Sequence, residues 1–167
     1  YEGVPGSGKS YHAICEKFLP WVKQGRRLYI AVDGIYLDRL SLFTGIELKT
    51  LEQQITIWKD SVEVLQAFPH VEPGSAVIID EAQTVFRSMQ KVEPGLLRWL
   101  ETHRHYGVDI LLMSQDFRQM SQGVTRLIEA TVKFRKLAFV GLSKKYQGKV
   151  RGNPEDNEVI RAFVGTY

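Results

Sequence analysis

The sequence predicts an α/β protein built on a mainly parallel β-sheet. Two short, largely apolar runs, Ala76–Asp80 and Val108–Ser114, each end on a polar residue. Apolar strands of this kind are typical of a parallel sheet whose two faces are both covered by helices. Segments with helical spacing alternate with the apolar runs, which favours right-handed strand–helix–strand crossovers.

The spacing of apolar residues predicts the remaining elements in order. The expected elements are a helix over Lys9–Lys23 ended by Gly25, a strand over Leu28–Val32, a loop or short helix within Asp33–Thr50, a helix over Leu51–Phe68 that is either continuous or interrupted near Thr56, a helix from Pro94 to Gly107, a helical Val124–Ala130, a strand within Thr131–Val140, and a short exposed strand over Tyr146–Arg151. The segment Glu158–Tyr167 shows no decisive pattern.

Composition fits one α/β domain, which we expect to span residues 1–167. Apolar residues make up 44% of the chain and charged residues 25%, and the net charge is +3. A charge this small indicates neither nucleic acid nor anionic lipid as a partner, although the basic stretch within Thr131–Arg151 could contact either. The single cysteine, Cys15, excludes an internal disulfide. No apolar run approaches the ~20 residues of a membrane span.

Residues 3–10 read Gly-Val-Pro-Gly-Ser-Gly-Lys-Ser and match the phosphate-loop pattern G-x-x-x-x-G-K-[ST] without a mismatch. Inward-turned backbone N–H groups and the start of the following helix form a nest for phosphates. Lys9 is expected to act at the β and γ phosphates, and Ser10 to ligate Mg²⁺. The predicted nucleotide contacts are Gly3, Val4, Pro5, Gly6, Ser7, Gly8, Lys9, Ser10 and Tyr11. The alternative is a glycine-rich turn that caps a helix and carries a surface lysine.

Only Tyr1 and Glu2 precede the loop, whereas a phosphate loop normally follows a buried strand. We therefore expect that the first strand is largely missing and that the chain is a fragment of a longer protein. The order of the motifs suits a P-loop NTPase of the additional-strand (51432-like) type. In that arrangement the fourth strand inserts between the first strand and the third.

Two carboxylates follow the apolar run at Ala76, namely Asp80 and Glu81. At the tip of a parallel strand they would face the crevice where ligands bind. Asp80 is expected to hold Mg²⁺ through water, and Glu81 to polarise an attacking water as a general base. The alternative is structural, with Asp80 capping a helix and Glu81 in its first turn.

Two further side chains are candidates for the site. Gln115 follows the second apolar run and could contact the γ-phosphate or the lytic water, or it could mark a plain strand-to-loop transition. Arg104 lies between His103 and His105 near a predicted helix end, where cations are favourable in any protein. It could instead be a transition-state arginine, acting in its own chain or toward a neighbouring subunit.

Several stretches together resemble one known family. They are Gly3–Tyr11, Val77–Gln83, Trp99–Gln115 and, more briefly, Gly152–Asp156. The first two are generic to phosphate-loop proteins, whereas the stretch His-Arg-His-Tyr-Gly-Val-Asp-Ile within the third is much more specific. Over essentially its whole length, the chain resembles the zonula occludens toxin (Zot) family, the assembly and export ATPases of filamentous phages.

The resemblance implies an ATPase domain on the cytoplasmic face of the bacterial inner membrane, followed by a transmembrane helix and a periplasmic tail beyond residue 167. It implies phage coat protein, phage DNA and a secretin channel as partners, and a homo-oligomer in the full-length protein. It also favours Arg104 and the flanking histidines as site residues. The chain departs from the family at Val32-Asp33, where members often carry Thr-Asn.

Three functions are therefore compared. The first is an assembly motor that hydrolyses ATP with Mg²⁺. The second is a small-molecule kinase, which Asp80-Glu81 and the lack of an arginine-rich lid disfavour. The third is a nucleotide-binding interaction module, or toxin domain, without turnover. No Asn-Lys-x-Asp motif for guanine is present, which favours ATP over GTP.

Overall fold

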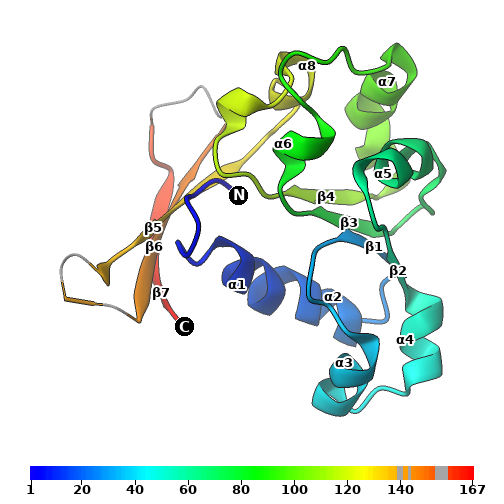
Figure 1. The fold of residues 1–167 in the computed structure, drawn as a ribbon, viewed down its shortest axis with the longest axis horizontal. Coiled ribbons are helices and arrows are strands. Elements are labelled where there is room, and N and C mark those ends of the chain that lie inside the picture. Colours follow the sequence, from blue (N-terminus) through cyan, green and yellow to red (C-terminus); the bar gives the residue numbers. More distant parts are fainter. Residues whose placement is uncertain (139–140, 143, 153–157) are drawn as a thin grey trace.

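The computed structural model describes residues 1–138, 141–142, 144–152 and 158–167 (Figure 1). Its helices are α1 (Lys9–Ala13), α2 (Leu19–Lys23), α3 (Leu37–Thr44), α4 (Leu48–Gln54), α5 (Ser61–Ala67), α6 (Ala82–Val85), α7 (Pro94–Thr102) and α8 (Gln122–Thr125). Its strands are β1 (Leu28–Ala31), β2 (Ile55–Ile57), β3 (Ala76–Ile79), β4 (Asp109–Leu112), β5 (Thr131–Lys136), β6 (Lys145–Arg151) and β7 (Arg161–Thr166). A π-helical segment, Ile14–Phe18, joins α1 to α2, so the predicted helix over Lys9–Lys23 is confirmed.

The central sheet has the order β2-β1-β3-β4, and all of its strands are parallel. Beyond β4, Glu2 forms parallel bridges with both Ser114 and Lys133. The residues that lead into the phosphate loop therefore lie between the end of β4 and β5. This arrangement confirms the predicted additional-strand order. Glu2 marks the place of the first strand, just before the phosphate loop, and β4 lies between that place and β3.

A second sheet of order β5-β6-β7 is antiparallel. The sequence did not predict this change from parallel to antiparallel pairing. The expectation that Tyr146–Arg151 is an exposed strand is wrong for Tyr146, which is only 4% exposed. Its ring packs against the phosphate loop and α1, as described below.

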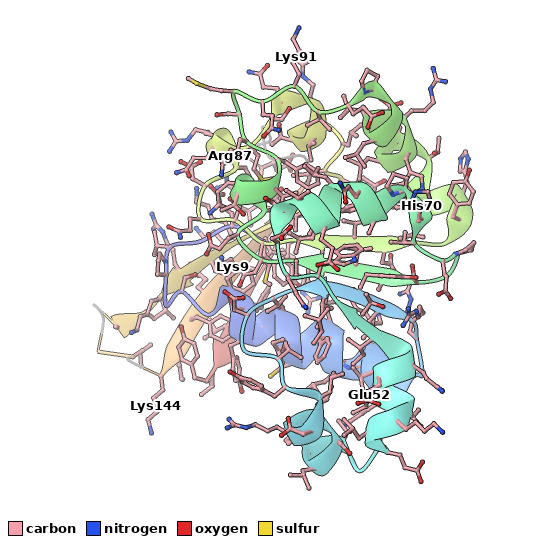
Figure 2. All side chains as sticks on the ribbon, turned by 45° about the vertical axis from the view of Figure 1, so that its right-hand side comes forward. Lys9, Glu52, His70, Arg87, Lys91 and Lys144 are labelled. Atoms are coloured by element: carbon pink, nitrogen blue, oxygen red, sulfur yellow. The ribbon has the colours of Figure 1, made fainter. Side chains whose placement is uncertain are left out.

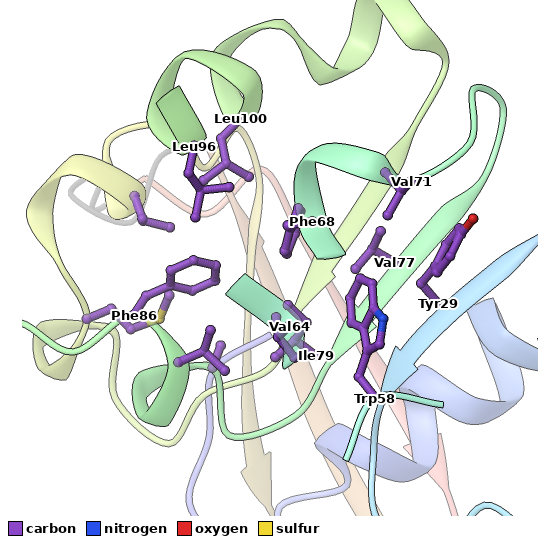
Figure 3. Close-up of a cluster of buried hydrophobic side chains, with 14 of the residues drawn as sticks. Tyr29, Trp58, Val64, Phe68, Val71, Val77, Ile79, Phe86, Leu96 and Leu100 are labelled. Carbon is purple, nitrogen blue, oxygen red and sulfur yellow. The ribbon is translucent and has the colours of Figure 1, made fainter. Parts of the chain in front are cut away.

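Helices cover both faces of the central sheet (Figure 1). Side chains of β3 alternate between two cores, as the period of a strand requires. Val77 and Ile79 pack with α5, α6 and α7, in the cluster shown in Figure 3. Ala76 and Ile78 pack on the other side with residues of the first helix, among them Phe18. The full burial of β3 explains its apolar sequence.

The helix predicted over Leu51–Phe68 is wrong in its continuous form, and the expected interruption near Thr56 is confirmed. The chain leaves α4 at Gln54 and forms the edge strand β2, which pairs parallel with β1. Its Ile-Thr-Ile sequence is β-branched throughout, which favours a strand. The Asp60 side chain then caps α5 by accepting bonds from Val62 N and Glu63 N.

The prediction around Val124–Ala130 is also wrong in extent. The helix there, α8, covers only Gln122–Thr125, and β5 follows directly at Thr131. Within Asp33–Thr50 the structure has α3 and the beginning of α4. Phe139 and Val140, and Asn153–Asp156 of the family-like stretch, lie outside the described residues.

Candidate functional site

The phosphate loop is anchored to the strands on either side of it. Gly3 N donates to Ser114 O at 3.1 Å, and Phe134 N donates to Glu2 O at 2.7 Å. Gly3 has no room for a side chain, because an added Cβ would lie 2.5 Å from Ser7 Oγ and 3.0 Å from the carbonyl oxygen of Phe134. The loop thus starts at the carboxyl edge of β4, and α1 begins immediately after it.

Gly8 closes the loop in a left-handed conformation, with φ +93°. Its Cα lies against the buried ring of Tyr146 from β6, and an added Cβ would approach Tyr146 Cγ to 2.6 Å. Gly165 of β7 crowds the same ring, and His12 Nδ1 lies 3.1 Å from its hydroxyl oxygen. The antiparallel sheet therefore supports the phosphate loop from the side opposite β3.

The loop lysine lies among carboxylates. Lys9, at the start of α1 (Figure 2), has a side chain that is only 7% exposed. Its Nζ lies 3.3 Å from Asp80 Oδ1 and 3.8 Å from Glu81 Oε1. Ser10 Oγ donates to Asp80 Oδ2 at 3.2 Å. The structure thus brings together the ends of the loop and of β3, as the sequence predicted.

Asp80 does not cap α6, so the structural alternative for this residue is not what the structure shows. Its oxygens accept bonds from Lys9, Ser10 and the backbone N of Glu81, the last at 2.9 Å. The residue before α6 is Glu81, whose side chain makes no capping bond. The Asp80 carboxylate is therefore directed to the loop, and the Glu81 carboxylate lies 3.8 Å from Lys9 Nζ without capping the helix.

Glu81 has a strained backbone with φ 47° and ψ 44°. Within the described part of the chain it is the one non-glycine residue with positive φ. Such a conformation costs roughly 1–2 kcal/mol, and it is found where surrounding contacts require it. Here it turns the chain sharply between β3 and α6.

Two amide side chains hold the Glu81 carboxylate. Gln115 Nε2 donates to Glu81 Oε2 at 3.2 Å, and Gln83 Nε2 donates to the same oxygen. Gln83 in turn accepts a bond from the buried Ser114 hydroxyl at 2.8 Å. Gln115 thus lies at the site, and the network connects the ends of β3 and β4.

The oxygen atoms at Ser10 and Asp80 fit a divalent cation. They lie within 3.2 Å of each other at the mouth of the loop. Mg²⁺ prefers oxygen ligands of this kind, usually one or two carboxylates together with phosphate oxygens and water. The residues present are therefore chemically suited to Mg²⁺.

Arg104 lies away from this site, which corrects the expectation that it acts in its own chain. It belongs to a 3₁₀ turn, His103–Tyr106, that precedes the amino end of β4. Gly74 N donates to Tyr106 O, which places this turn beside the start of β3. Asp80 follows the other end of β3, and a strand of this length spans about 13 Å. Arg104 pairs instead with Glu129.

A cavity of about 220 Å³ lies between β4, α7 and α8. Its lining includes Tyr1, Leu100, Ile110 and Leu112, but none of the predicted loop or carboxylate residues. The cavity is mainly apolar. It is not the place where a triphosphate would contact Lys9.

Sequence analysis missed the supporting residues of the site. Gln83 stands two positions after Glu81, and this proximity within the quoted motif was a usable signal. Tyr146 and Tyr167 lie far from the loop in sequence, and no sequence pattern predicts that they contact it. Tyr167 Oη nevertheless donates to Gly6 O at 2.8 Å.

Comparison with known proteins places this geometry in context. A family model described as Zonular occludens toxin (Zot) matches residues 1–164. The Gene 1 protein of Xanthomonas phage phiLf is 26% identical over 159 residues, covering 87% of this chain and 36% of that protein. ORF301 of Pseudomonas phage Pf3, named as a candidate assembly protein, is 26% identical over 163 residues, covering 93% of this chain and 48% of that protein. The chain thus spans between a third and a half of these relatives.

Solved structures share the fold. The N-terminal domain of zonular occludens toxin from Neisseria meningitidis has a TM-score of 0.62 and 20% identity, covering 99% of this chain and 90% of that one. The genome packaging NTPase B204 from Sulfolobus turreted icosahedral virus 2, in complex with AMPPCP, has a TM-score of 0.59 and 19% identity, covering 89% and 92%. At these identities the likeness establishes the fold and nothing finer.

Proposed function

Since the chain belongs to the zonular occludens toxin family, we propose that it binds ATP with Mg²⁺ and hydrolyses it to drive phage assembly or export. The observation that carries the proposal is the contact of Lys9 with Asp80 and Glu81 at the mouth of an intact phosphate loop. A lysine, a hydroxyl and two carboxylates converge where a triphosphate would end. A merely structural turn does not require this set.

Each side chain of the site has its own role in the proposed reaction. Lys9 exchanges its carboxylate partners for phosphate oxygens and offsets the charge that develops at the γ-phosphate. Ser10, directly, and Asp80, through water, would hold Mg²⁺, and the bound ion would supply positive charge that neutralises the phosphates. Glu81 accepts a proton from the attacking water as a general base. Gln115 and Gln83 orient the Glu81 carboxylate through the bonds described above.

The cellular setting is part of the same proposal. The two phage relatives support a role in phage morphogenesis, and the B204 structure supports nucleotide use by this fold. We propose that the domain works at the cytoplasmic face of the inner membrane as a homo-oligomer, with coat protein, phage DNA and a secretin channel as partners. Within the described residues, no helix has the length and apolar character needed to cross a membrane.

Phosphate release from ATP by the purified chain with Mg²⁺ tests the proposal. Lys9→Ala should abolish nucleotide binding, whereas Lys17→Ala, an exposed lysine in the same continuous helix, should leave it unchanged. Glu81→Gln should keep binding and lose roughly 10²–10⁴-fold in turnover, the usual contribution of a general base. Equal turnover in Glu81→Gln and wild type would remove Glu81 from the mechanism. Binding without phosphate release in wild type would favour the interaction module.

A further inference from the structure

A cluster of tyrosines lies beside the phosphate loop and has no part in the proposed hydrolysis. Ring centroids of Tyr11 and Tyr167 lie 5.7 Å apart, and those of Tyr146 and Tyr167 lie 5.3 Å apart. Tyr146 is buried, but Tyr11 is 44% exposed and Tyr167 is 41% exposed. Two aromatic side chains therefore offer surface to solvent next to the loop.

The cluster is fixed to the loop itself. Tyr167 Oη donates to Gly6 O at 2.8 Å, although 161 positions separate the two residues in sequence. Tyr11 belongs to α1 and directly follows Ser10. In Figure 1 the carboxyl end of β7 lies beside the start of α1. The rings thus sit within reach of a molecule held by the loop.

The strands that carry the carboxylates and the tyrosines indicate how a bound nucleoside triphosphate would be oriented in the loop. Asp80, Glu81 and Gln115 come from the ends of β3 and β4, on one side of the loop. Tyr146 and Tyr167 come from β6 and the end of β7, on the other side, since Glu2 lies between β4 and β5. If the γ-phosphate lies near Lys9 and the carboxylates, the nucleoside leaves the loop toward the tyrosines.

We propose that Tyr11 and Tyr167 form the binding surface for the nucleobase, which stacks on their exposed rings. The ligand class is the aromatic base of a nucleoside triphosphate, recognised by its π-face. This inference rests on the proposed function, because it extends the same loop site from the phosphates to the base. Stacking of a base on an aromatic side chain is worth enough to change affinity roughly 5- to 100-fold.

Titration calorimetry with Mg-ATP and with inorganic tripolyphosphate separates the base from the phosphates. Tyr11→Ala and Tyr167→Ala should each weaken ATP binding roughly 5- to 100-fold and leave tripolyphosphate binding within about twofold. Tyr167→Phe, which keeps the ring and removes the bond to Gly6 O, should bind ATP much better than Tyr167→Ala. Tyr36→Ala, at a 58% exposed tyrosine between β1 and α3, is the matched control and should bind both ligands normally.

The outcomes distinguish this inference from the proposed function. Lys9→Ala should weaken the binding of both Mg-ATP and tripolyphosphate, whatever the role of the tyrosines. If the wild-type chain binds neither ligand, the proposed function fails and the inference fails with it. If Tyr167→Ala and Tyr11→Ala weaken the binding of both ligands equally, the rings only support the loop and the inference is wrong. If they weaken neither, the rings do not contribute to binding and the inference is also wrong. Photolabelling of wild type with 8-azido-ATP avoids variants altogether. Attachment at or next to Tyr11 or Tyr167 supports the inference, and attachment elsewhere overturns it.

Discussion

The contact between Gly8 and Tyr146 makes a sharp stability prediction for Gly8→Ala. The new Cβ would meet Tyr146 Cγ at 2.6 Å, and Gly165 crowds the hydroxyl end of the same ring. The left-handed backbone, φ +93°, adds its own penalty. We expect Gly8→Ala to lower the free energy of unfolding by about 2–5 kcal/mol. The left-handed conformation contributes roughly 1–2 kcal/mol of this loss and overpacking roughly 1–3 kcal/mol.

Gly6→Ala is the matched control in the same loop. Gly6 also has a left-handed backbone, φ +71°, but an added Cβ would have nothing within 4 Å. Gly6→Ala should therefore lower the free energy of unfolding by about 1–2 kcal/mol, the cost of the left-handed backbone alone. The two variants therefore isolate the crowding by Tyr146 from the strain that both share.

Thermal and urea unfolding without nucleotide measure the difference. Gly8→Ala should melt roughly 2–12 °C below Gly6→Ala, since 1 kcal/mol moves the midpoint of a chain this size by about 2–4 °C. Combining Gly8→Ala with Tyr146→Leu should recover part of the loss, because residues in contact are not additive. If Gly8→Ala is no less stable than Gly6→Ala, the antiparallel sheet does not support the loop as described.

Three further predictions follow from contacts at other positions. Burial lowers the pKa of His12 from its usual value of 6.5. Near and below that pH the unfolded chain therefore binds more protons than the folded chain, and the free energy of unfolding falls as the pH falls. The melting temperature should drop more between about pH 7.5 and about pH 5.5 in wild type than in His12→Gln. Gln83→Ala should lower turnover about tenfold and leave ATP affinity unchanged, because it removes a bond that orients the Glu81 carboxylate; a change in affinity alone would contradict this role. Arg104→Ala should bind ATP as wild type does, because Arg104 lies at the opposite edge of the sheet, and calorimetry showing weaker binding would refute that placement.

Much of the fold was predictable because its signals are local. The apolar run at Ala76–Ile79 indicated a strand buried on both faces, and the two core clusters confirm it. The strand order was also predicted correctly, since it depends on the order of motifs along the chain. The sequence left open whether the helix over Leu51–Phe68 is continuous or interrupted near Thr56, because Ile55–Ile57 can satisfy either pattern. Pairing with β1 makes this segment a strand.

The positions of side chains around the loop depended on contacts between distant segments. Arg104 stands near Gln115 in sequence, yet β4 carries the two residues to opposite edges of the sheet. The left-handed backbone of Glu81 and its bond to Gln115 likewise follow from how β3 and β4 end together. Spacing along the chain does not encode such pairings.

The sequence by itself determined the phosphate loop at Gly3–Ser10, because contiguous glycines, a lysine and a serine carry their chemistry wherever the loop folds. It also determined that carboxylates would meet this loop, because the end of an apolar parallel strand faces the same edge. Only the tertiary structure decided what surrounds the loop. Tyr146 and Tyr167 reach it from an antiparallel sheet formed by the last part of the chain, and their contacts with Gly8 and Gly6 arise from packing across the whole length of the protein.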